Sequence, residues 1–201
     1  MTGSRDRFSG AIAGVGSGNG VRIVVGRWDE SPFGAFADVM IAEPDGTRVL
    51  LAPDERVAEF VSATYRFDRV EIGAVLVTPD WRVTAPGLDL HLVIGPRTLL
   101  GRLLRLVPAR LATASGWTRV TDPVSRLLLR GVRTRGTAGN GRREYYGATD
   151  LHRITSLTGS WAGVDLGRLA QVSPDPGFGF GSTPVRPSVT AIVTTVDGSS
   201  A

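Results

Sequence analysis

The sequence predicts a β-dominated α+β fold, an antiparallel barrel or curved sheet with two or three short helices. Residues typical of hairpin turns separate apolar segments at Asn19-Gly20 and at Pro44-Asp45-Gly46. Leu88, Leu90 and Leu92 alternate with polar residues at the two-residue period of a strand. Helical periodicity is confined to short stretches. The length of 201 residues fits one domain spanning 1–201.

The first half of the chain is expected to form two hairpins and a helix. Residues 8–28 form two strands around a glycine-rich turn, whose glycine spacing does not match a dinucleotide-binding G-x-G-x-x-G. Residues 36–43 and 47–51 form the second hairpin. In residues 54–65 apolar side chains recur three, four and seven positions apart, which predicts an amphipathic helix. Strands are then expected at 69–78 and 81–95.

Residues 97–142 form a basic insertion of helices and loops. From 97 to 143 there are 11 arginines against one acid, a net charge of +10, whereas the remainder carries 12 arginines against 18 acids. Within the insertion, residues 98–107 and 122–130 each place leucines on one side of a short predicted helix. Two interpretations stay open: the helices cap the open end of a sheet or barrel, or they contact an anionic membrane surface.

Strands resume after a glycine- and arginine-rich loop. We expect them at residues 144–148, 151–161 and 188–196, followed by a flexible tail at 197–201. No apolar run reaches the roughly 18 residues of a membrane span, and no signal peptide is evident. The expected location is therefore cytoplasmic.

Composition excludes several kinds of chemistry. All 23 basic residues are arginine, cysteine is absent, and histidine occurs twice, at His91 and His152. Without lysine or cysteine there is no Schiff base, no P-loop lysine, no thiol nucleophile and no cysteine-ligated zinc. Each histidine follows an aspartate by two residues, as Asp89-Leu-His91 and Asp150-Leu-His152. Because Asp89 and His91 alternate with buried leucines, we expect them to face solvent, and we expect neither a metal nor a cofactor.

The densest polar cluster is Arg142-Arg143-Glu144-Tyr145-Tyr146. Guanidinium groups bind carboxylates or phosphates bidentately, and a buried carboxylate beside them can transfer protons. Arg143, Glu144 and Tyr146 are therefore candidate ligand-binding residues. The alternative is a solvated strand end with salt bridges. Few aromatic residues lie among the arginines, so nucleic acid is a minor hypothesis.

Two further segments resemble motifs of the acetoacetate decarboxylase-like superfamily. Its G-x-Y-x-E strand motif is similar to Gly34-Ala-Phe36-Ala-Asp38, and its G-R-E-x-Y-G-F-P-K-K motif is similar to the segment from Ser62 to Val70. Both lysine positions are replaced, by Arg69 and Val70, and the proline by Asp68. The resemblance covers residues 20–95 and implies an antiparallel cone-shaped barrel around a small-molecule cavity.

The resemblance implies a ligand site at Asp38, Tyr65 and Arg69. Arginine stays protonated and cannot form an imine, but it can hold a carboxylate while Asp38 and Tyr65 orient the ligand. The leading hypothesis is a protein that binds a small anionic or carbonyl-bearing metabolite, with noncovalent acid-base catalysis left open. The alternative is a peripheral interaction protein that docks on anionic lipid or another macromolecule through residues 97–143. The oligomeric state is left open.

Overall fold

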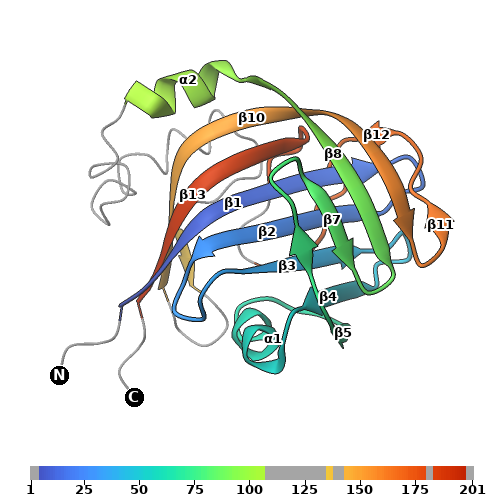
Figure 1. Ribbon diagram of the computed structural model, residues 1–201, viewed down its shortest axis with the longest axis horizontal. Coiled ribbons are helices and arrows are strands. Elements are labelled where there is room, and N and C mark those ends of the chain that lie inside the picture. The colour runs from blue at the N-terminus through green and yellow to red at the C-terminus, as the bar shows by residue number, and fades with distance from the viewer. Residues whose placement is uncertain (1–4, 107–134, 138–142, 180–182, 198–201) are drawn as a thin grey trace.

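The computed structural model describes residues 5–106, 135–137, 143–179 and 183–197. Strands make up 54% of the structure, and the described residues contain two helices, which confirms the β-dominated prediction. Figure 1 shows a strongly curled sheet with α1 below it and α2 along its upper edge. The helices are α1 (Glu55–Ser62) and α2 (Leu99–Leu106).

The long strands form the body of the sheet. They are β1 (Arg5–Ser17), β2 (Arg22–Glu30), β3 (Phe36–Ala42), β4 (Arg48–Ala52), β7 (Arg82–Ala85), β8 (Leu88–Arg97), β10 (Arg143–Trp161) and β13 (Ser188–Asp197). Shorter strands are β5 (Arg69–Ile72), β6 (Leu76–Val77), β9 (Arg135–Thr137), β11 (Val164–Asp165) and β12 (Leu169–Ala170). The two predicted hairpins are thus confirmed as β1–β2 and β3–β4.

Ten strands form one continuous path, in the order β5-β4-β3-β2-β1-β13-β10-β8-β7-β6. The outermost strands, β5 and β6, are consecutive in the chain and are joined by only three residues, 73–75. Because so short a connection must reach from one end of the path to the other, the sheet has to curl. The result is a half-barrel.

The sheet is mixed, which corrects the purely antiparallel prediction. All neighbouring strands pair antiparallel except β4 and β5, which are parallel. Parallel neighbours need a crossover, and α1 lies in it. Asp54 caps this helix by accepting a hydrogen bond from the Val57 backbone N–H at 2.9 Å. The predicted strand 69–78 is divided into β5 and β6, and the predicted strands 144–148 and 151–161 are one strand, β10.

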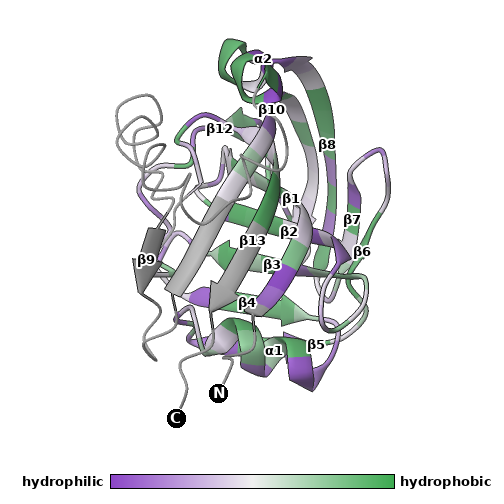
Figure 2. Ribbon diagram, turned by 90° about the vertical axis from the view of Figure 1, so that its left-hand side faces the viewer, coloured by the Kyte–Doolittle hydropathy of each residue, from purple (hydrophilic) through white to green (hydrophobic). Residues whose placement is uncertain are grey.

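The curled sheet has a concave face and an outer face. The concave face carries the largest core cluster, which includes Ile23, Val39, Leu90 and Leu157. On the outer face, α1 covers Leu50 and its neighbours. A second outer cluster, around Phe178, covers part of β2 and β3. In the view of Figure 2 the β-strands curve around the concave side, and α2 stands at the top beside β10.

The predicted helix 98–107 is confirmed as α2. The predicted helix 122–130 lies outside the described residues. The loop predicted at 131–143 is described only at 135–137 and 143, and there it is wrong, because 135–137 form the strand β9, which pairs with β10, and Arg143 begins β10. No helix within the described ranges is long and apolar enough to cross a membrane.

Candidate functional site

Strand register places charged and small residues in one row across the concave face. Asp150 of β10 is opposite Ala191 of β13, Ala191 is opposite Ala11 of β1, and Ala11 is opposite Arg27 of β2. Residues directly opposite each other project to the same face, and Ala11 belongs to the concave core. Asp150 and Arg27 therefore lie on either side of two alanines in this row.

The row continues to β3, and the next row along the strands holds two more polar residues. Arg27 is opposite Ala37 of β3, another concave core residue. In the next row along the strands, His152 is opposite Val189 of β13 and Arg97 of β8. Arg27, Arg97, Asp150 and His152 are thus brought to one face from three strands, although the first and last of them are 125 positions apart in the sequence.

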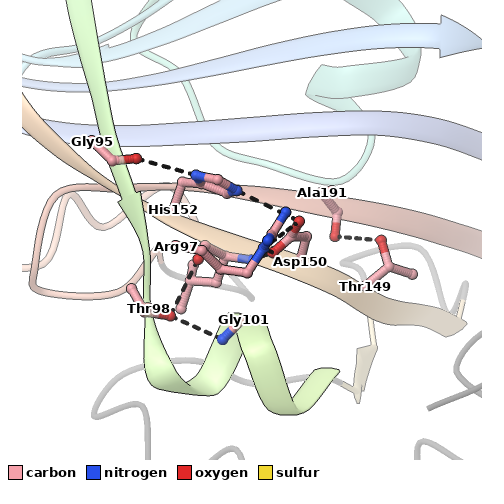
Figure 3. A network of polar contacts seen from close by, with 9 residues as sticks. Gly95, Arg97, Thr98, Gly101, Thr149, Asp150, His152 and Ala191 are labelled. Carbon is pink, nitrogen blue, oxygen red and sulfur yellow. Dashed lines mark hydrogen bonds and ion pairs between the residues drawn. The ribbon is translucent and has the colours of Figure 1, made fainter. Parts of the chain in front are cut away.

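Arg97, Asp150 and His152 form a polar network (Figure 3). The Arg97 Nε donates to both oxygens of Asp150, at 2.7 and 3.0 Å. The second oxygen, Oδ2, lies 3.5 Å from His152 Nε2, and His152 Nδ1 lies 3.2 Å from the Gly95 carbonyl oxygen. The three side chains are 31%, 20% and 32% exposed, so solvent reaches them. The arrangement orients an imidazole by a carboxylate on one side and a carbonyl on the other.

The environment of Asp150 favours its ionised form. Burial alone would raise the pKa of this carboxyl, but the hydrogen bonds from Arg97 and from the Leu151 N–H, with the charges of Arg97 and His152, lower it below its usual range. Asp150 therefore presents an ionised carboxylate to Arg97 and to the His152 ring beside the concave face.

α2 begins directly at this network. The Thr98 N–H donates to the Leu151 carbonyl at 2.9 Å, and the Thr98 hydroxyl accepts from the Gly101 N–H at 2.9 Å. Figure 3 shows the first turn of α2 beside Asp150. The cap fixes where β8 ends and therefore where the Arg97 side chain starts.

Arg27 is a further charged residue of the concave face. Its guanidinium carbon lies 5.0 Å from the ring centroid of Trp81, which precedes β7. β1, β13, β10 and β8 lie between β2 and β7 in the sheet, so this contact crosses the concave side. Within the described chain the Arg27 Nε is buried and has no hydrogen-bond partner, although it forms a long ion pair with Asp29 Oδ1 at 3.8 Å.

The opposite end of the half-barrel is held by a different set of contacts. Glu43 Oε1 accepts from Trp161 Nε1 at 2.9 Å and from an Arg69 guanidinium nitrogen at 3.3 Å. Arg69 also pairs with Glu71, Nε to Oε1 at 2.9 Å. The guanidinium that was predicted to hold an anion is therefore already bonded to two carboxylates, and its side chain is 48% exposed.

Asp38 lies on the outer face, because it alternates along β3 with the concave residues Ala37 and Val39. Its Oδ1 accepts from Trp28 Nε1 at 2.9 Å, and the residue is 4% exposed. Burial raises the pKa of Asp38 to about 6, opposed by the hydrogen bond from Trp28. Asp38 is therefore separated from the concave network by the sheet itself.

The other predicted site residues are placed differently. Tyr65 follows α1 and packs on the outer face with Met40 and Phe67. The backbones of Arg143, Glu144 and Tyr146 lie in β10, but their side chains lie outside the described residues.

The two Asp-Leu-His segments do not come together. Both are in strands that pair, β8 and β10, but His91 is opposite Thr158, whereas His152 is opposite Arg97. Leu88, Leu90 and Leu92 are buried and Asp89 is exposed, as the alternation predicted, whereas His91 is only partly exposed. No group of three or more potential metal ligands occurs among the residues that the structure describes.

Sequence reasoning did not identify Arg27 and Arg97 as site residues. A signal for Arg27 was present, because it continues the alternation of Ile23 and Val25 and so is in phase with the buried face of its strand. An arginine in that phase must either find a partner or line a surface that water or ligand reaches.

Comparison with known proteins adds no relative: no protein-family model, no curated protein and no solved structure matches this chain. The functional argument therefore depends on the geometry of the concave face.

Proposed function

We propose that the concave face binds a small organic anion, with Arg27 holding a carboxylate of the ligand. The observation that carries the proposal is the buried Arg27 Nε without a hydrogen-bond partner. The Arg27 side chain is 28% exposed and its ion pair with Asp29 is long, at 3.8 Å, so the guanidinium can still bind a ligand carboxylate. Guanidinium and carboxylate groups form paired, charge-assisted hydrogen bonds, which favours this class of ligand.

The register also limits the size of the ligand. Asp150 and Arg27 are three strand spacings apart, about 14 Å along the sheet, and the curl brings their side chains closer together. A ligand with an acidic end at Arg27 and an apolar body over Ala11 and Ala191 would place its other end near His152. The proposed class is therefore a carboxylic acid with an apolar chain and a hydroxyl or carbonyl group toward the far end.

The network of Arg97, Asp150 and His152 supports a role in proton transfer to or from that far end. His152 is oriented by Asp150 and is partly exposed, which are the properties of a general acid or base. Lysine is absent from the sequence, so a covalent amine intermediate is excluded. Acid-base chemistry at this site would be noncovalent, which is the option that the replacement of both motif lysines left open.

The test is a thermal-shift screen of aliphatic carboxylic, hydroxy- and oxo-acids, followed by titration of the hits against single variants. Arg27→Ala should reduce affinity at least tenfold. Arg153→Ala, at an exposed position on β10, is the matched control and should leave affinity unchanged. Circular dichroism of each unliganded variant checks that the fold is intact.

Two other arginine variants separate the proposal from the sequence-based expectation. Arg69→Ala and Arg143→Ala should leave binding within about twofold of the parent protein. Binding that survives Arg27→Ala but is lost in Arg69→Ala or Arg143→Ala would reject Arg27 as the group that holds the anion.

A further inference from the structure

α2 exposes a stripe of leucines. Leu99, Leu103 and Leu106 are 73%, 51% and 79% exposed, and their spacing of four and three residues places them on one side of the helix. Leu100 and Leu104 are partly buried on a different side, and Gly101 is buried. The helix therefore has a covered side and an uncovered apolar side.

Two features prevent α2 from turning its leucines toward the sheet. A side chain at Gly101 would collide with the backbone of Leu151, so the helix lies directly against β10. The contacts of Thr98 with Leu151 and Gly101 fix the first turn. Because the helix is held at both its start and its covered side, the leucine stripe is presented outward as part of the folded structure.

Positive charge lies beside the stripe. Arg102 and Arg105 are exposed on α2, on one flank of the leucines. A second copy of the chain on this stripe would bring two such pairs of arginines together, which like-charge repulsion opposes. An anionic bilayer complements both features, because its acyl chains can accommodate the leucines and its negatively charged headgroups can pair with the arginines.

We infer that α2 docks this protein on anionic membranes, with Leu99, Leu103 and Leu106 inserted at the level of the headgroups and Arg102 and Arg105 against lipid phosphates. An amphipathic helix that lies in the interface buries its apolar side to a depth of about 5–10 Å, which the length of a leucine side chain reaches. The inference does not depend on the proposed ligand site, because none of these five residues belongs to it.

The experiment is vesicle sedimentation with the full chain, using phosphatidylcholine vesicles with and without 30 mol% phosphatidylserine as probes (roughly the composition range of anionic membranes). The parent protein should bind the anionic vesicles at least tenfold more strongly than the neutral ones, and the binding should weaken as salt is raised. The triple variant Leu99→Ser, Leu103→Ser, Leu106→Ser should lose at least tenfold in partitioning.

The matched control is Leu76→Ser with Val164→Ser, which removes apolar side chains of 63% and 60% exposure elsewhere and should not alter partitioning. All replaced residues are exposed, so thermal unfolding should stay close to that of the parent. Light scattering of the protein without lipid tests the alternative, in which a second copy of the chain covers the leucine stripe. Absence of vesicle binding at low salt, or a dimer that the triple variant abolishes, would overturn the inference.

Discussion

Asp38→Asn should have a higher free energy of unfolding than the parent protein at neutral pH. That gain over the parent should largely disappear in acid. The folded carboxyl has a pKa of about 6, against 3.8 for its ordinary value, because it is buried. Between these two values the folded state keeps a proton that the unfolded chain releases, so the free energy of unfolding falls as pH rises through this window. Each pH unit corresponds to about 1.36 kcal/mol, and the full effect is about 3 kcal/mol.

The assay is denaturant unfolding of parent and variant between pH 3.5 and 7.5. An amide at position 38 does not titrate, and its oxygen can still accept from Trp28 Nε1, so the difference in unfolding free energy isolates this carboxyl. We expect that difference to move by about 3 kcal/mol in favour of Asp38→Asn across the whole range, with about 2 kcal/mol of the change between pH 4 and 6. Asp89→Asn, at an exposed position, controls for the change in net charge. A difference that is constant with pH, or that moves the other way, would refute the reasoning.

Three other changes test the packing and the network. Gly101→Val should lift α2 from β10, because its Cβ meets the Leu151 backbone, and should lower the free energy of unfolding by about 1–3 kcal/mol in denaturant unfolding. Arg97→Ala should raise the pKa of Asp150 in an NMR titration; the loss of stability at neutral pH should disappear as pH falls below the usual aspartate range, where the parent pair is also lost. Phe8→Ala empties a site that is 3% exposed and should cost about 3–5 kcal/mol in the same unfolding assay.

The local elements were predictable because each carries its own signal. Both hairpins follow from their turn residues, and α1 follows from a cap and an apolar period. The division of 69–78 into β5 and β6 was not predictable in this way. Gly73 lies between them and donates its N–H to the Ala52 carbonyl, and this contact depends on the parallel pairing of β5 with β4, from which α1 separates it in the chain.

The candidate site could not be predicted from the pattern alone, because strand register assembles it. Asp150 and Arg27 share a row only through the pairings of β10 with β13, β13 with β1, and β1 with β2. A slip of one residue in any of these ladders would send one of the two groups to the other face. Asp38 shows the reverse case, since a motif resemblance selected it and its strand phase turns it to the outer face.

The use of arginine rather than lysine has a physical reason at position 27. The guanidinium lies over Trp81 while its Nε is buried, and a planar, weakly hydrated cation tolerates both conditions better than an ammonium group does. A lysine there would lose the Nε donor and would tend to shed its proton on burial. Arg27→Lys keeps the charge at neutral pH only if solvent reaches the amine. Arg27 therefore contacts Trp81 across the curl and also places a positive charge on the concave face. The two roles are separable by mutation. Loss of ligand affinity without a change in the free energy of unfolding would assign Arg27 to binding, and the converse would assign it to folding.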